Sequence, residues 1–284
     1  MDIGPTQTPA GAQPETIRIA RYHDVEVVTL NRPAKLNAWN TTMAREMQRA
    51  IEAANGDPHV GAVVVTGEGR AFCAGADVAM LDERRARRTR GDPEPVDHGG
   101  MPVGLDWVAL CRRSKPLIAA VNGIAVGVGL TMVLPFDVIV ASDAARFGVG
   151  FTTMGLLPEL GSSHFLVQRM GPGRASEFCL SGDVWDAAHS VDARLVDRVV
   201  PAERLLDECL ALARRIAANP RPQLQLLKEL LTQNATESDL ELIQDREDRL
   251  NRAHCVTSRE HLEAVKAFRE KRRPDFGYDD PSGT

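Results

Sequence analysis

The stretch Val121-Asn122-Gly123-Ile124-Ala125-Val126-Gly127-Val128-Gly129 decides the fold. The apolar residues 117–121 lead into it as a buried strand, and its glycines turn the chain and open a helix. The first amides of a helix have no partner within the helix and lie at the positive end of its dipole, so they suit an oxyanion. The stretch therefore predicts a strand, a turn and a helix whose backbone can hold a negatively charged oxygen.

A second stretch of small residues, Ala71-Phe72-Cys73-Ala74-Gly75-Ala76-Asp77, lies about fifty residues earlier, directly after a predicted strand and turn. Small side chains let a ligand approach the main chain, and Gly75 can adopt a conformation that aims an N–H group outward. Neither stretch is specific by itself, because glycine turns and small-residue runs are common. Their meaning depends on the rest of the chain.

Strands and helices alternate through the first half of the sequence, which predicts an α/β fold. Apolar side chains at helical spacing predict a helix over residues 42–54, and a hairpin turn is expected near His23 and Asp24. The expected strands cover residues 17–20, 25–30, 60–66, 117–121 and 138–141. Beyond residue 200 the apolar spacing becomes that of amphipathic helices. We therefore expect a disordered lead-in at residues 1–15, a core at residues 16–200 and a helical region at residues 201–284.

Composition and charge exclude several classes of protein. The 284 residues are 43% hydrophobic and 26% charged, as in ordinary globular proteins, and the net charge of -5 does not favour nucleic acid as a partner. Residues 116–141 are almost wholly apolar, but glycines and prolines divide them into pieces shorter than the ~20 residues of a membrane span. We therefore expect neither nucleic-acid binding nor membrane insertion.

Five scattered cysteines, without a C-x-x-C pair, indicate reduced thiols rather than a zinc or redox centre. The first fifteen residues lack the basic start and apolar segment of a secretory signal. We accordingly expect a cytoplasmic protein without a bound metal.

Several further segments accompany the two small-residue stretches in a fixed order. They are Asn31-Arg32-Pro33 with Leu36-Asn37-Ala38, Lys115-Pro116 with Ala119-Ala120-Val121-Asn122-Gly123, Gly155-Leu156-Leu157-Pro158, and Ala267-Phe268-Arg269-Glu270-Lys271-Arg272-Arg273-Pro274. In these segments the sequence resembles the enoyl-CoA hydratase/isomerase (crotonase) superfamily. The resemblance covers roughly residues 17–276.

The resemblance implies an α/β crotonase-like spiral of ββα units, followed by C-terminal helices that assemble the chain into a homotrimer or a hexamer. It also implies an acyl-CoA thioester as substrate, with no separate cofactor because coenzyme A is part of that substrate. In the family two backbone amides hold the thioester oxygen, and these carry over here to Ala74 and Val128. Such a donor can stabilise an enolate-like transition state by roughly 3 kcal/mol.

The acids that hydratases of this family use are missing here. Their first glutamate carries over to Thr131 and their second to Phe151, and neither side chain is an effective general base. Glu159, however, occupies the position of the catalytic glutamate of peroxisomal-type Δ3,Δ2-enoyl-CoA isomerases. The resemblance therefore implies Glu159 as a single acid and base, which favours Δ3,Δ2 isomerisation over hydration. The alternative is that Glu159, which follows a proline, only favours the start of a helix.

The resemblance also implies a set of residues that bind the acyl-CoA. They are Arg32, Ala34, Lys35, Leu36, Ala71, Ala76, Asp77, Gly127, Thr131 and Phe151, completed by Phe268 and Lys271, which a neighbouring subunit could supply. Lys35 and Lys271 could each meet a phosphate. For Asp77 the alternative is that it caps or orients its own loop, and for Thr131 that it packs or bonds the backbone.

An arginine-rich segment at residues 82–100 is predicted as a mobile surface loop or a frayed helix. Its charges are expected to be solvated, and the alternative is that some arginines among residues 84–90 contact a phosphorylated substrate.

Three functions therefore remain in competition. The favoured one is a Δ3,Δ2-enoyl-CoA isomerase, and the others are an atypical enoyl-CoA hydratase and a non-catalytic acyl-CoA-binding protein on the same fold. A dinucleotide-binding oxidoreductase is disfavoured, since Met132 occupies the place of the third glycine in G-x-G-x-x-G.

Overall fold

A six-stranded sheet forms the centre of the computed structural model, which describes residues 14–93 and 100–278. Only its edge strand β1 is antiparallel to its neighbour, and the remaining pairs are parallel. In spatial order its strands are β1 (Ile17–Tyr22), β2 (Val25–Leu30), β3 (Ala62–Gly67), β5 (Leu117–Val121), β7 (Val138–Ser142) and β10 (Arg198–Val200). A smaller sheet contains β4 (Ala71–Cys73), β6 (Ile124–Val126), β8 (Arg146–Gly148) and β9 (Trp185–Asp186). The predicted α/β fold is thus confirmed, with its strands in two sheets.

The alternation of side chains along the central strands builds a core on each face of the large sheet. Val63 and Val65 of β3 face one cluster with helix α1 (Thr41–Gly56), while Val64 faces the other cluster with helix α7 (Leu205–Ala217). All of these side chains are fully buried, as expected of parallel strands covered on both faces.

The remaining helices differ greatly in length. They are α2 (Val78–Arg90), α3 (Trp107–Arg113), α4 (Val128–Thr131), α5 (Ser162–Ser181), α6 (Ala187–Asp192), α8 (Arg221–Asn234), α9 (Leu240–His254) and α10 (Arg259–Glu270), with short 3-10 helices at Pro33–Lys35 and Ala202–Arg204. α4 is a single turn, and α5 is kinked at Gly171, where φ is 76° ahead of Pro172.

Most strand and helix predictions are confirmed. The hairpin forms between β1 and β2 with its turn at His23 and Asp24, and α1 extends the predicted helix by one residue at its start and two at its end. The Asn40 side chain caps α1 by accepting from the amide of Met43 at 2.8 Å. Most of the predicted lead-in lies outside the described residues.

Of the two alternatives predicted from residue 82 onward, the surface loop is wrong for the first part of the segment, which forms a helix. Residues up to Arg90 belong to the regular helix α2, which ends at Gly91 in the left-handed conformation. The arginines are tolerated because α2 buries none of its side chains and Arg87 pairs with Glu83 at 2.9 Å. The predicted segment includes residues 94–99, which lie outside the described part of the chain.

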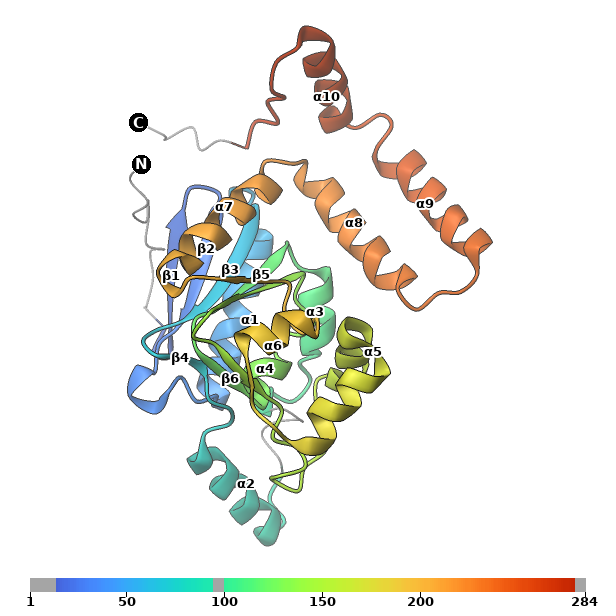
Figure 1. The fold of residues 1–284 in the computed structure, drawn as a ribbon. Coiled ribbons are helices and arrows are strands. Elements are labelled where there is room, and N and C mark those ends of the chain that lie inside the picture. The colour runs from blue at the N-terminus through green and yellow to red at the C-terminus, as the bar shows by residue number, and fades with distance from the viewer. Residues whose placement is uncertain (1–13, 94–99, 279–284) are drawn as a thin grey trace.

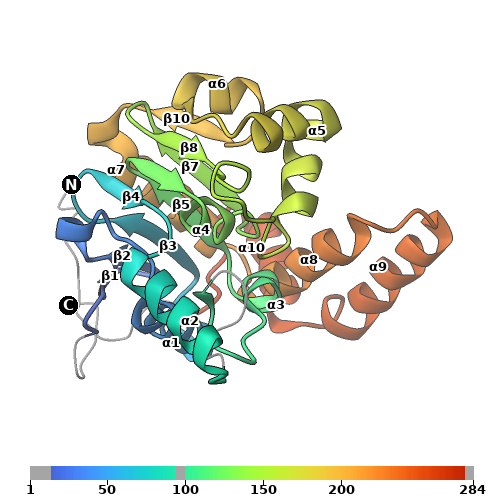
Figure 2. The ribbon, with the colours of Figure 1, turned by 90° about the horizontal axis from the view of Figure 1, so that it is seen from below.

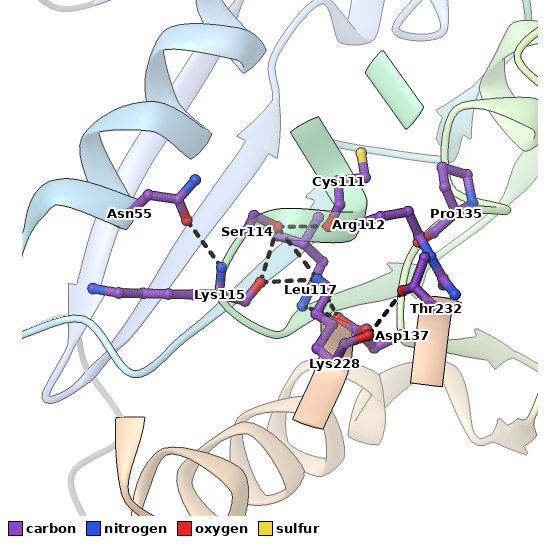
Figure 3. Close-up of polar contacts among 10 residues, drawn as sticks. All are labelled: Asn55, Cys111, Arg112, Ser114, Lys115, Leu117, Pro135, Asp137, Lys228 and Thr232. Atoms are coloured by element: carbon purple, nitrogen blue, oxygen red, sulfur yellow. Dashed lines mark hydrogen bonds and ion pairs between the residues drawn. The ribbon is translucent and has the colours of Figure 1, made fainter. Parts of the chain in front are cut away.

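Part of the helical region that starts at residue 201 packs directly on the core. Its first helix, α7, covers the outer face of the large sheet through buried Leu205, Cys209 and Ala213. α8 then docks on the core through Lys228, whose Nζ lies 2.7 Å from Asp137 Oδ2 and 3.2 Å from the Lys115 carbonyl (Figure 3). α8 and α9 project beyond the sheets in both ribbon views (Figures 1 and 2). No helix within the described residues is long and apolar enough to span a membrane.

Candidate active site

The two small-residue stretches meet in the small sheet. β4 pairs in parallel with β6, so the residues after both strands emerge at the same edge. Contact there is very close, since a side chain at Gly129 would place its Cβ 2.2 Å from the Cys73 carbonyl oxygen. Only glycine therefore lets α4 sit against the end of β4. The predicted backbone site has its two halves side by side.

Hydrogen bonds decide which amide of residues 71–77 can serve a ligand. The Ala74 amide donates to the Leu36 carbonyl at 3.0 Å, so it is already used, and the prediction that Ala74 holds the thioester oxygen is wrong. Trp39 bonds the Gly75 carbonyl at 2.8 Å and accepts from the Asp77 amide at 2.8 Å. In such a parallel bridge the intervening Ala76 amide points away from Trp39. Among the described residues, no backbone carbonyl accepts from Ala76.

The glycine turn before α4 exposes a second amide. Gly127 has φ 54° and ψ -127°, and its own amide donates to the Gly148 carbonyl at 2.9 Å. Val128 is the first residue of α4 and therefore lacks a helical acceptor, and no carbonyl of the described chain takes its place. Gly127 thus sets the turn, and Val128 carries the available N–H group.

A carboxylate reaches α4 from a distant part of the chain. The Thr131 hydroxyl, fully buried in α4, donates to Glu159 Oε1 at 3.4 Å. Glu159 itself is half-buried, and its carbonyl accepts from the Ser162 amide at the start of α5. Phe151 is also buried, with 5% of its surface exposed. Thr131 is therefore packed in the core, and its hydroxyl also bonds a side chain, which the alternative of packing or bonding the backbone did not include.

The loop around Arg32 is fastened to the end of β4. Asn37, which is fully buried, accepts from the Arg32 amide at 2.8 Å and donates to the Ala71 carbonyl at 2.8 Å. The Arg32 guanidinium lies 2.7 Å from Asp77 Oδ2, and this hydrogen bond holds the pKa of the Asp77 carboxyl below its usual range. Asp77 also caps α2 by accepting from the Ala79 amide at 3.1 Å. Its carboxylate is thus occupied in shaping the loop.

Comparison with known proteins identifies the family. A profile described as Enoyl-CoA hydratase/isomerase matches residues 20–279. The chain belongs to the enoyl-CoA hydratase/isomerase family. It is 36% identical to the 2,3-dehydroadipyl-CoA hydratase of Escherichia coli K12 over 91% of this chain and 97% of that protein. It is also 33% identical to the 1,2-epoxyphenylacetyl-CoA isomerase of the same bacterium, over 89% of this chain and 94% of that protein.

Solved structures of hydratase/isomerase family members share the fold. The enoyl-CoA hydratase of Bacillus anthracis superposes with a TM-score of 0.83 at 27% identity, and the match covers 93% of this chain and 100% of that chain. The protein is therefore an acyl-CoA enzyme of the enoyl-CoA hydratase/isomerase family with the crotonase fold.

The residues assigned to the coenzyme A part of the substrate are only partly brought together. Arg32 and Leu36 lie in the loop beside β4, whereas Ala34 and Lys35 are exposed on its outer side. Phe268 and Lys271 lie on and just after α10, at the opposite end of the molecule from α2 (Figure 1). Phe268 is 85% exposed. Within one chain of this hydratase/isomerase, the two C-terminal residues do not reach the site.

A groove of ≈ 400 Å³ runs beside Asp77, between the start of α1 and helix α2. Arg84 and Arg87 line it together with Glu83, whose carboxylate pairs with Arg87. The groove thus carries both signs of charge. That these arginines are only solvated stays a prediction, and contact with a phosphorylated substrate stays its alternative.

Some functional residues of this family member escaped the sequence reasoning. Asn37 and Asn122 stood in the motifs without a role, yet both hold loops of the site, since Asn122 donates to the Gly69 carbonyl at 2.9 Å. The sequence feature that could have identified both asparagines is a polar residue within a run of apolar or small residues.

The site region holds neither a reactive thiol nor a metal-binding cluster among the described residues. Burial raises the pKa of the nearby Cys73 thiol to about 12, so no thiolate forms there at neutral pH. Within the described residues, no group of three or more His, Cys, Asp or Glu side chains could hold a metal ion.

Proposed function

We propose that this enzyme is a Δ3,Δ2-enoyl-CoA isomerase in which Glu159 is the single acid and base. The observation that carries the proposal is the contact between Glu159 Oε1 and the Thr131 hydroxyl on α4. It brings the carboxylate to the helix whose first amide, that of Val128, is available to a ligand. A base and an oxyanion donor on neighbouring elements are what proton removal next to a thioester needs.

The amides of Ala76 and Val128 form the oxyanion site in this proposal. Ala76 replaces Ala74 because the Ala74 amide is bonded to Leu36. Both amides follow paired strands, and α4 lies against the end of β4. The thioester oxygen would accept from both amides, and its negative charge grows as the enolate forms.

The reaction needs one base and no other reactant. Glu159 removes a proton from C2 of a 3-enoyl thioester, and the electron pair of that C–H bond forms a C1–C2 double bond while the thioester carbonyl becomes the oxyanion of a dienolate. The oxyanion then re-forms the carbonyl, the C1–C2 pair becomes the C2–C3 double bond, and the pair of the former C3–C4 double bond takes a proton at C4 from the protonated Glu159. The carboxylate is thereby regenerated, and the product is the 2-enoyl thioester.

Hydration fits the site less well. It needs a group that activates water beside the double bond, and Phe151 and Thr131 offer no carboxylate. Hydration is nevertheless the second candidate, since the relative at 36% identity is named a hydratase and the one at 33% an isomerase.

The test compares two reactions of the purified enzyme. We expect conversion of a trans-3-enoyl-CoA to the 2-enoyl-CoA, and we expect Glu159→Gln to lower kcat by at least about 100-fold while acyl-CoA binding persists. Wild-type enzyme that hydrates 2-enoyl-CoA faster than it isomerises 3-enoyl-CoA would favour the hydratase. Acyl-CoA binding without either reaction would favour a non-catalytic binder.

We further propose that the chain forms a trimer or hexamer through its C-terminal helices and works in the cytoplasm. Leu227 and Leu231 of α8 are 52% and 64% exposed, one helical turn apart, and Phe268 of α10 is 85% exposed. Covering such side chains would favour association. The five cysteines are all free, which suits a reducing compartment.

A further inference from the structure

Thr131 is held rigidly. It is fully buried in α4, and its amide donates to the Gly127 carbonyl at 2.9 Å. α4 cannot shift toward β4, because Gly129 already lies against the Cys73 carbonyl. Threonine is branched at Cβ, so few orientations are open to its hydroxyl. The hydroxyl that donates to Glu159 therefore has a nearly fixed position.

Glu159, in contrast, lies in a segment without regular structure. Residues 156–159 belong to no helix or strand, Leu157 is 85% exposed, and Leu160 has φ 51°. Because these residues form no helix or strand, side-chain contacts help to fix where the carboxylate lies. The hydroxyl of the rigid Thr131 makes one such contact, at Oε1.

We propose that Thr131 is a positioning residue that holds the Glu159 carboxylate at a set distance from the Val128 amide. The proposal rests on the proposed role of Glu159 as the base. Val128 and Thr131 are three residues apart in α4, so the helix itself serves as the spacer. The contact of 3.4 Å is long for an O–H···O bond, as hydrogen bonds in ligand-free active sites commonly are.

The experiment measures isomerisation of a trans-3-enoyl-CoA by wild-type enzyme and by Thr131→Val and Thr131→Ser. Valine has the shape of threonine without the hydroxyl, whereas serine has the hydroxyl without the methyl group. We expect Thr131→Val to lower kcat about 10-fold with KM within about twofold, because misplacement of a reacting group affects the chemical step. We expect Thr131→Ser to recover most of kcat.

Two further measurements separate positioning from folding. Deuterium uptake at C2 of the substrate in D2O, followed by NMR, reports proton removal directly and should fall with kcat in Thr131→Val. Thr89→Val is the matched control, since Thr89 is exposed and its hydroxyl donates to the Arg85 carbonyl of its own helix at 3.0 Å. It should match wild-type in both assays.

Each outcome decides the proposal. Thr131→Val with wild-type kcat and C2 exchange overturns the role of Thr131 and leaves the isomerase proposal intact. Thr131→Ser as slow as Thr131→Val overturns it too, since the methyl group and not the hydroxyl would matter. Wild-type enzyme that neither isomerises nor exchanges overturns both proposals together.

Discussion

Lys228 of α8 and Asp137, which precedes β7, form an ion pair of 2.7 Å, with only 6% of the lysine side chain exposed. Asp137 also accepts from the Leu117 amide at 2.7 Å, so the pair links α8 to the first residue of β5 (Figure 3). Burial lowers the pKa of Lys228, and the carboxylate of Asp137 opposes that effect. The C-terminal helices are thus attached to the core by a charge pair that depends on both partners.

Removing one partner of this pair should destabilise the protein. We expect Lys228→Met to lower the free energy of unfolding by about 3 kcal/mol, because Asp137 would keep its charge without a counter-charge. Urea unfolding followed by circular dichroism measures the loss. Lys35→Met is the control, since 60% of the Lys35 side chain is exposed, and it should change stability by less than about 0.5 kcal/mol. Equal losses for the two variants would contradict the buried pair.

The ion pair of Asp77 with Arg32 should make the stability of the protein depend on pH. Its pKa lies below the ordinary 3.8, chiefly because Arg32 donates to the ionised carboxylate, so its contribution is present above pH 3.8 and is lost as pH falls through the lowered pKa. Asp77→Asn keeps the capping oxygen but removes the charge. We expect it to cost about 1–2 kcal/mol at pH 7 and less below pH 3.8. Unfolding free energies measured across this range test the expectation, and a cost that does not change with pH would refute it.

The amide of Val128 can be removed without lengthening a side chain. Val128 is the first residue of α4, where proline is tolerated, and proline has no N–H group. We expect Val128→Pro to lower kcat by about 100-fold to 1,000-fold, as loss of an oxyanion donor does. Val128→Ala keeps the amide and should stay within about tenfold of wild-type. Equal rates for the proline and alanine variants would exclude the amide from catalysis.

Asn37 should be intolerant of a charge. Its side-chain amide donates to the Glu68 and Ala71 carbonyls at 3.0 and 2.8 Å, in a fully buried position. Asn37→Asp would turn a carboxylate toward these two acceptors and cost at least about 2 kcal/mol. Aspartate, like asparagine, tolerates the left-handed conformation of residue 37, where φ is 54°. Backbone strain would therefore not contribute to the loss of stability. A thermal melting point equal to that of wild-type would contradict the assigned hydrogen bonds.

The proposed assembly predicts that charges on α8 will prevent association. We expect the double variant Leu227→Asp and Leu231→Asp to elute as a monomer in size-exclusion chromatography with light scattering, because aspartates cannot be buried without partners. Gln225→Asp adds a charge to an exposed polar position of the same helix and should leave the oligomer intact. A wild-type protein that is already monomeric would refute the proposal.

Local patterns in the sequence predicted most of the fold. The β-branched run that includes the three consecutive valines of β3 predicted a strand, and the glycines after β5 predicted the turn that opens α4. The absence of carboxylates at Thr131 and Phe151 was likewise visible in the chain itself. These features follow from residue type and spacing, because strand, turn and helix preferences act over a few neighbouring residues.

Only the tertiary structure decided which amide is available and where the carboxylate lies. Ala74 and Ala76 are the same residue type in one short stretch, but the Leu36 carbonyl accepts from the Ala74 amide. Trp39 instead bonds Gly75 and Asp77, the residues on either side of Ala76. Thr131 and Glu159 are in contact although 28 positions of the sequence separate them. Whether a backbone amide is available depends on which acceptor a distant segment places beside it. Short-range sequence patterns contain no information about that acceptor.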